Sequence, residues 1–176
     1  MNSEPHLICL IGAECTGKTT LAQALAQRLG LPFTPTDPLY WQPGWQPSPN
    51  RLVRRQVRKL VTAERWVLDG NFDDQRSEAW RRAECIVWLD YPLSTVLGQV
   101  ARRNLGWFIN GTETWAGNRM SLVQAISGIL HALKSHRRKS RSYPIWLAQF
   151  PKLQVIRLKN PQECQEWLRT FDNHAP

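Results

Sequence analysis

The stretch from position 12 to 19 carries the clearest chemical pattern in the sequence. It reads Gly-Ala-Glu-Cys-Thr-Gly-Lys-Thr and matches the GxxxxGK[ST] pattern of a phosphate-binding loop, or P-loop. Glycines let the backbone N–H groups of such a loop turn toward phosphate oxygens, and the following helix directs its positive end at the same anion. We expect a nucleotide to contact Gly12, Ala13, Glu14, Cys15, Thr16, Gly17, Lys18, Thr19 and Thr20.

Side chains of this loop and one later carboxylate predict a site for ATP and Mg²⁺. The Lys18 ammonium can reach the β- and γ-phosphates, and the Thr19 hydroxyl can bind the metal. Asp69 ends an apolar strand-like stretch, where a carboxylate would hold Mg²⁺ or its bound water. The alternatives are a glycine-rich turn without a ligand and, for Asp69, an Asp-Gly turn. The strand before the loop and the helix after it favour phosphate binding by the loop. The position of Asp69 at a strand end beside the loop favours metal binding by Asp69.

A second group of residues lies in a segment that is broken by prolines and rich in aromatic side chains. Asp37 follows the second predicted strand, where a carboxylate can accept the proton of a substrate hydroxyl or orient it. A turn-forming role before Pro38 explains Asp37 equally well. Trp41 and Trp45 either fill the core or form a wall for a substrate ring, and their position in a loop favours the wall.

Arginine clusters supply the third group. Phosphoryl transfer is catalysed mainly by positioning and charge stabilisation, so arginines are expected near the γ-phosphate. Arg102 and Arg103 lie on one predicted helix, and Arg138 and Arg141 follow the next. The segment between the two clusters predicts a helical lid, although each arginine taken alone fits a solvated helix face. We also expect Arg102 to contact the nucleotide.

The composition limits the class of protein. A length of 176 residues fits one domain, and we treat residues 1–176 as a single unit. No apolar stretch is long enough to span a membrane, no signal peptide is apparent, and the four cysteines form no CxxC pair, so we expect a cytoplasmic protein. The net charge of +9 fits nucleic acid or phosphate ligands. The absence of a recognisable nucleic-acid module favours phosphates.

The hydrophobic pattern alternates short apolar strands with amphipathic helices. This pattern predicts a parallel sheet covered on both faces, and hence a three-layer α/β fold. Ser48 or Asn50 is expected to cap a helix, and Ser121 to cap another that carries one apolar stripe, formed by Leu122, Ile126, Ile129, Leu130 and Leu133. The predicted strands span 7–11, 31–34, 65–69, 85–90 and 153–158. The predicted helices span 18–29, 51–64, 73–82, 93–105, a stretch from 122 and 161–171, with loops over 35–50 and 106–118.

Three stretches together resemble the topology modulation protein family of small bacterial P-loop proteins. They are the P-loop, the segment 37–45 that reads DPLYWQPGW, and the segment 66–72 that reads WVLDGNF. The resemblance extends over about residues 7–170. It implies a core similar to nucleoside monophosphate kinases, with five parallel strands in the order 2-3-1-4-5, an acceptor-side segment over about 35–64 and a lid over about 104–141.

The resemblance also implies roles for individual residues. Lys18, Asp37, Asp69 and Arg138 are the expected catalytic residues, with Thr19 and Asp69 at the metal. The expected contacts to the second substrate are Asp37, Trp41, Trp45, Gly70, Asn71, Arg76, Arg103 and Arg141. Cys15 stands where the family usually has glycine, and in this detail the loop resembles that of ribosylnicotinamide kinases.

These patterns predict an ATP- and Mg²⁺-dependent kinase for a nucleotide, a nucleoside or another small hydroxyl compound. The expected partners are a nucleotide and a small-molecule acceptor, without a membrane, for a monomer or homodimer. A ribosylnicotinamide-kinase-like enzyme is one alternative. The other, from a different class, is a nucleotide-dependent regulatory protein that contacts DNA through its basic surface.

Overall fold

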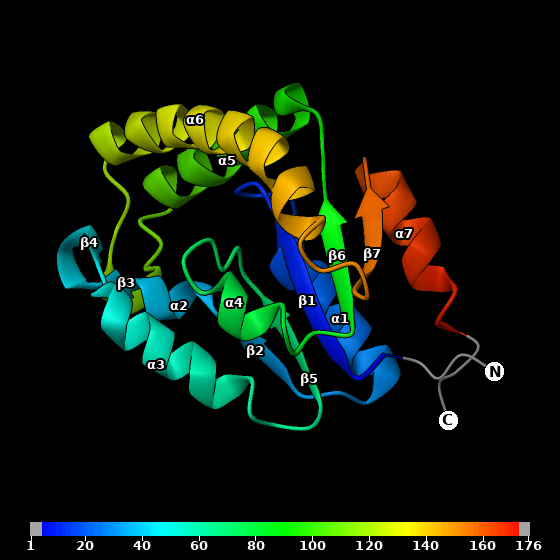
Figure 1. Cartoon of the computed structure of the whole chain (residues 1–176). Coiled ribbons are helices and arrows are strands. Elements are labelled where there is room, and N and C mark those ends of the chain that lie inside the picture. Colours follow the sequence, from blue (N-terminus) through cyan, green and yellow to red (C-terminus); the bar gives the residue numbers. More distant parts are fainter. Residues whose placement is uncertain (1–4, 173–176) are drawn as a thin grey trace.

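A five-stranded parallel sheet forms the centre of the molecule. The computed structural model describes residues 5–172. Residues 1–4, which belong to the segment without an apparent signal peptide, lie outside this range. The strands are β1 (Leu7–Gly12), β2 (Phe33–Pro35), β5 (Trp66–Asp69), β6 (Cys85–Leu89) and β7 (Gln154–Leu158). Their spatial order is β2-β5-β1-β6-β7, which confirms the predicted order of the five strands (Figure 1).

Apolar side chains on both faces of the sheet explain why these segments are strands. β1, at the centre, pairs in parallel with β5 on one side and β6 on the other, and Cys9, Leu10 and Ile11 have no exposed surface. Continuous burial of successive residues is typical of a parallel sheet that is covered on both faces. The sheet places the carboxyl ends of β1 and β5, with Gly12 and Asp69, side by side.

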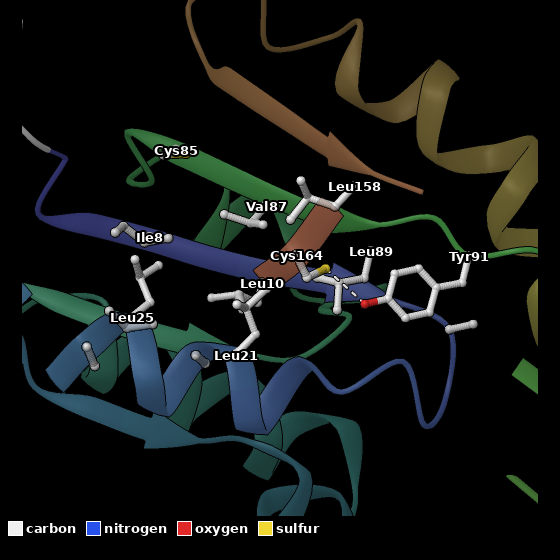
Figure 2. Packing of buried hydrophobic residues seen from close by; sticks show 14 of the residues in the cluster. Ile8, Leu10, Leu21, Leu25, Cys85, Val87, Leu89, Tyr91, Leu158 and Cys164 are labelled. Atoms are coloured by element: carbon white, nitrogen blue, oxygen red, sulfur yellow. Dashed lines mark hydrogen bonds between the residues drawn. The ribbon is translucent and has the colours of Figure 1, made fainter. Parts of the chain in front are cut away.

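Helices cover the two faces and give the molecule two apolar cores. On one face, α1 (Lys18–Leu29) and α7 (Pro161–Arg169) pack on the sheet, and Leu21 and Leu25 of α1 lie against Ile8 and Leu10 of β1 (Figure 2). On the other face, α3 (Asn50–Leu60) buries Val53 and Val57 against the sheet. Long α5 (Leu93–Ile109) and α6 (Leu122–Leu147) lie side by side above the carboxyl ends of the strands (Figure 1).

The segment 35–50 is more ordered than the predicted loop. It contains α2 (Asp37–Tyr40) and a hairpin of β3 (Trp41–Gln42) and β4 (Gln46–Pro47) around a 3₁₀ turn, Pro43–Trp45. Prolines and Gly44 permit the tight turn, and the hairpin is too short to have a readable alternation of apolar and polar residues. Helix α3 begins after Pro49, and neither Ser48 nor Asn50 caps it with a side chain.

Helices α5 and α6 correct two further expectations. α5 continues to Ile109 through Gly106, past the predicted end at 105. Ser121 forms a capping box with Gln124 at the start of α6, as its position predicts. The predicted apolar stripe of α6 is wrong for Leu122, Ile126 and Leu130, which are each 56% exposed. Its other two members, Ile129 and Leu133, are half-buried, and Ile129 packs against the core.

Small residues of α6 form its closest contact with α5. Ala125 and Ala132 are buried, and the buried amide of Asn104 on α5 donates a hydrogen bond to the Ala125 carbonyl at 3.2 Å. A Cβ atom on Gly128 would lie 2.7 Å from the Asn104 Nδ2 atom. The two helices therefore approach too closely for large side chains between them. Within residues 5–172, no helix is long and apolar enough to cross a membrane.

Alanine at Gly128 should destabilise the contact between α5 and α6. Alanine is favoured over glycine in a helix by about 1 kcal/mol, but at Gly128 its Cβ would displace the Asn104 amide and break the bond to Ala125. We expect Gly128→Ala to lower the free energy of unfolding by about 1 kcal/mol, because a lost buried hydrogen bond outweighs the gain in propensity.

Gly98→Ala is the matched control, since Gly98 lies inside α5 with nothing within 4 Å of an added Cβ. It should raise the free energy of unfolding by up to about 1 kcal/mol, measured by urea denaturation. Equal stabilisation by both alanines would contradict the close packing at Gly128.

Candidate active site

A cavity of about 680 Å³ lies between the P-loop, the carboxyl ends of the strands and the pair α5 and α6. Its size is within the usual range for a small-molecule site. The predicted residues that line it are Glu14, Cys15, Lys18, Asp37, Trp41, Trp45, Asn71, Arg103 and Arg138. Residues that sequence reasoning did not select line it too: Tyr40, Asp73, Asp74, Trp107, Trp115, His131, Ser135 and Lys139.

The backbone of the P-loop turns through three residues with positive φ. Gly12 and Gly17 have φ of 153° and 85°, and Cys15 has φ of 58°. An added Cβ on Gly12 would lie 2.6 Å from the Leu89 carbonyl oxygen, so only glycine fits where the loop leaves β1. The Lys18 ammonium donates hydrogen bonds to the carbonyls of Gly12 at 3.3 Å and Ala13 at 2.7 Å, which holds it across the loop.

Asp69 connects the P-loop helix to the acceptor-side strand from beneath the cavity. Its carboxylate accepts hydrogen bonds from the Thr19 hydroxyl and, at 3.0 Å, from the Thr36 backbone N–H. Burial raises the pKa of Asp69, while these two hydrogen bonds oppose the rise. The adjacent Gly70 faces Thr36 so closely that a Cβ would lie 2.0 Å from the Thr36 Oγ1 atom, and Gly70 does not line the cavity.

Asn71 brings together the P-loop and the far end of α6. Its Oδ1 atom accepts from the Gly12 backbone N–H at 3.3 Å and from the Tyr143 hydroxyl at 3.1 Å. The carboxylate of Asp73 accepts from the same hydroxyl at 3.4 Å and forms an ion pair with Arg138. Arg138 is thus fixed at the cavity wall by a carboxylate that no short motif predicts.

Glu14 forms a second link between the P-loop and α6. Its carboxylate accepts from the ammonium of Lys139 and the hydroxyl of Ser135, each at 2.9 Å. Burial alone would raise the pKa of Glu14, but the positive charges of Lys139 and Lys18 lower it to about 2. The Lys139 side chain is only 5% exposed, so this ion pair is largely shielded from water.

Four half-buried indoles form an aromatic wall on the other side of the cavity. Ring centroids are 5.5 Å apart for Trp41 and Trp45, 6.4 Å for Trp45 and Trp115, and 5.8 Å for Trp107 and Trp115, all with edge-to-face geometry. The Arg103 guanidinium lies over the Trp107 ring at 4.5 Å. We call these four residues the tryptophan wall.

Asn118 fastens the two segments that carry the tryptophan wall. Its Oδ1 atom accepts from the Trp45 backbone N–H at 3.0 Å, and its Nδ2 atom donates to the carbonyls of Gln42 at 3.0 Å and Trp115 at 2.8 Å. The Trp45 indole N–H also donates to the Arg119 carbonyl at 3.1 Å. The hairpin and the loop between α5 and α6 therefore meet through a buried amide.

Three predicted arginines lie outside the cavity. Arg102 and Arg141 are exposed, on α5 and α6. The Arg76 guanidinium lies over the Trp146 ring at 4.2 Å and donates to the Asp73 carbonyl. Their expected roles stay predictions, and in this structure they face solvent or support neighbouring side chains.

Removing the Asn118 amide should separate the hairpin from the α5–α6 loop. We expect Asn118→Ala to increase amide hydrogen exchange in residues 41–47 and 112–119 by about 10- to 100-fold, because lost buried hydrogen bonds cost about 1–3 kcal/mol. Asn110→Ala is the control, since Asn110 is exposed at the end of α5. Unchanged exchange in both segments would contradict the role of Asn118.

The Glu14–Lys139 ion pair should give stability that depends on pH. The folded pKa of about 2 lies below the value of about 4.3 for an unfolded chain, so the stabilisation is complete above pH 5 and declines as the pH falls toward 2. We expect Glu14→Gln to lower the free energy of unfolding by about 2 kcal/mol at pH 7 and to flatten its decline between pH 5 and 3.

Denaturant titrations across this range measure both effects. Glu64→Gln, at an exposed glutamate, serves as the control. If the free energy of unfolding of Glu14→Gln declined between pH 5 and 3 as steeply as that of the wild type, the Glu14 carboxylate would not be the source of the decline.

Comparisons with known proteins agree with this fold. A family model described as an AAA domain matches residues 7–38, which span β1, the P-loop, α1 and β2. No curated protein matches the chain. Among solved structures, shikimate kinase from Aquifex aeolicus is 17% identical with a TM-score of 0.53, covering 94% of this chain and 96% of that one.

Two further solved structures are similar to this chain. Shikimate kinase from Bacteroides thetaiotaomicron is 15% identical with a TM-score of 0.59, covering 97% of this chain and 98% of that one. A gluconokinase from Sinorhizobium meliloti 1021 is 15% identical with a TM-score of 0.60, covering 95% and 89%. At such identities the likeness is one of fold: the chain has the α/β fold of small P-loop kinases.

Proposed function

We propose that the protein is an ATP- and Mg²⁺-dependent kinase that transfers the γ-phosphoryl group to a small hydroxyl compound. The observation that carries this proposal is that Lys18 of the P-loop and the carboxylate of Asp37 line one cavity. A kinase needs a phosphate site and an acceptor site that open into each other. We infer that the enzyme acts in the cytoplasm as a monomer or homodimer, and its four free cysteines fit a reducing compartment.

The donor side consists of the P-loop and the residues beneath it. The backbone N–H groups between Gly12 and Lys18 would hold the phosphates, together with the Lys18 ammonium. Thr19 and Asp69 fit Mg²⁺, since a hydroxyl and a carboxylate are the hard oxygen ligands that this ion prefers, and they already lie within hydrogen-bond distance of each other. Bound there, the ion supplies positive charge that stabilises the transferring phosphoryl group.

Asp37 is the candidate base on the acceptor side. Its carboxylate lines the cavity and, among residues 5–172, forms no hydrogen bond or ion pair. The hydroxyl group of an uncharged acceptor would donate a hydrogen bond to this carboxylate, which could then take up the hydroxyl proton. Arg103 lines the same cavity with its guanidinium over the Trp107 ring, and it is suited to stabilise charge on the transferring group.

Substitutions at Lys18 and Asp37 should separate the two halves of the site. We expect Lys18→Ala to weaken ATP binding and to lower phosphoryl transfer at least 100-fold. Asp37→Asn should lower transfer about 100-fold while ATP affinity stays within about twofold. Calorimetry with ATP and acceptor-dependent release of ADP measure the two quantities.

Matched controls are available for both variants. Lys152→Ala removes an exposed lysine, and Asp90→Asn changes a carboxylate that follows β6 and pairs with Arg157 outside the cavity. Neither should alter transfer more than about twofold. Full turnover by Lys18→Ala would overturn the donor assignment, and equal losses of binding and transfer in Asp37→Asn would remove its acceptor role.

A second candidate keeps the resemblance to the topology modulation protein family. Here the P-loop switches the conformation of a regulatory protein that contacts DNA, and the exposed basic face of α3, with Arg51, Arg55 and Lys59, would supply the contact. Two other arginines of α3, Arg54 and Arg58, form ion pairs with Glu78, which weakens that face. DNA affinity that falls steeply with salt would favour this candidate, and a flat dependence would exclude it.

A further inference from the structure

Charges and aromatic rings are distributed unevenly around the cavity, and the acceptor side is the more acidic and aromatic. We propose that the phosphoryl acceptor is nucleoside-like: a hydroxyl compound that carries an aromatic ring and has no phosphate or carboxylate group. The inference deepens the proposed kinase function and rests on it. Three separate observations support it: the cation partners, the unpaired carboxylates and the tryptophan wall.

Most cations of the cavity are already committed to the protein. Arg138 pairs with Asp73, and Lys139 pairs with Glu14. Lys18 spans the P-loop, where donor phosphates are expected. Among residues 5–172, one further arginine or lysine lines the cavity, and this residue, Arg103, forms no ion pair and no contact with the P-loop backbone. Its guanidinium donates a hydrogen bond to the side chain of its neighbour Asn104 at 3.4 Å.

Arg103 lies near both the P-loop and the tryptophan wall. Its guanidinium lies over the Trp107 ring at 4.5 Å, and its charge, like that of Asp37, acts on the thiol of Cys15 in the P-loop. A guanidinium in that place is suited to the transferring phosphoryl group. With Arg103 used in this way, no lysine or arginine that lines the cavity within residues 5–172 is left for a second phosphate or a carboxylate on the acceptor.

Carboxylates instead collect on the acceptor side. Asp37 and Asp74 line the cavity and form no ion pair among residues 5–172, although Asp74 accepts from the Asn50 amide at 3.3 Å. Both act with Asp73 on the Tyr40 hydroxyl, whose pKa is raised first by burial and then by these three negative charges. An anionic acceptor would meet uncompensated negative charge here, which costs more as water is excluded.

The tryptophan wall supplies the contact for a ring. Its four indoles remain half-buried, although large aromatic side chains are stabilised by full burial. Stacking of a base on an aromatic side chain is worth about 1–3 kcal/mol. The nearby carboxylates of Asp37 and Asp74 also favour a neutral or positively charged ring over an anionic compound.

The transfer step is balanced without a further reactant. The acceptor hydroxyl oxygen forms a bond to the γ-phosphorus, and the bond from that phosphorus to the β,γ-bridging oxygen breaks. ADP leaves with the electron pair of that bond. The hydroxyl proton passes to the Asp37 carboxylate and then to solvent, so the products are a phosphate monoester and ADP.

Calorimetry on the full chain, with adenosine, cytidine and nicotinamide riboside as probes, tests the inference directly. Their 5′-monophosphates, gluconate and shikimate are the anionic comparisons. We expect at least one nucleoside to bind tenfold or more tightly than its monophosphate and both acids. Trp115→Ala should weaken that binding about tenfold, Trp115→Phe should restore most of it, and ATP affinity should stay unchanged in both variants.

Two more variants separate packing from charge. Trp167→Phe alters an indole that contacts Phe171 away from the cavity and should have no effect on nucleoside binding. Asp74→Asn should reduce the preference for nucleoside over monophosphate several-fold. An unchanged preference in Asp74→Asn would contradict the part assigned to charge.

ADP release distinguishes failure of this inference from failure of the kinase assignment. Tighter binding of monophosphates, gluconate or shikimate, with ADP release that depends on them, would overturn the nucleoside-like acceptor and leave the kinase intact. Nucleoside binding without acceptor-dependent ADP release would leave the pocket assignment standing and overturn the kinase. Failure of every nucleoside to bind would overturn the inference.

Discussion

The buried carboxylate of Asp69 is the constraint on which the rest of the site depends. It accepts from Thr19 at the start of α1 and from the backbone of Thr36 at the end of β2, while its own strand pairs with β1. A buried charge is tolerated only when hydrogen bonds compensate it, so these partners must stay in place. One carboxylate thereby fixes the P-loop helix against the segment that carries Asp37.

Helix α6 closes the other side of the cavity by the same means. Its side chains reach separate segments near the strand ends: Lys139 pairs with Glu14, Arg138 with Asp73, and Tyr143 donates to Asn71. Each contact joins residues that are more than 60 positions apart, and each places a polar group at the cavity wall. A movement of α6 would therefore disturb its contacts with Glu14 and with Asn71 and Asp73 together.

Local patterns predicted the strands and most helices, and several residues selected from them line one cavity, while their roles stay predictions. The P-loop, the apolar strands and the ends of α1 depend on neighbours in sequence, and the sheet order followed from the family resemblance. Asp73, Ser135 and Lys139 were missed because their partners lie far away in sequence. Three members of the predicted α6 stripe, Leu122, Ile126 and Leu130, are exposed because close packing at Gly128 selects small residues, which a hydrophobic pattern does not detect.

If the protein is the proposed kinase, the P-loop and the tryptophan wall enclose one phosphoryl-transfer site. A crystal structure with Mg²⁺ and a non-hydrolysable ATP analogue would show this arrangement. We expect the metal at Thr19 and Asp69, the phosphates against the backbone of residues 13–18, and the γ-phosphate facing the cavity that Asp37 lines. A γ-phosphate directed away from that cavity, or a nucleotide bound outside the P-loop, would contradict it.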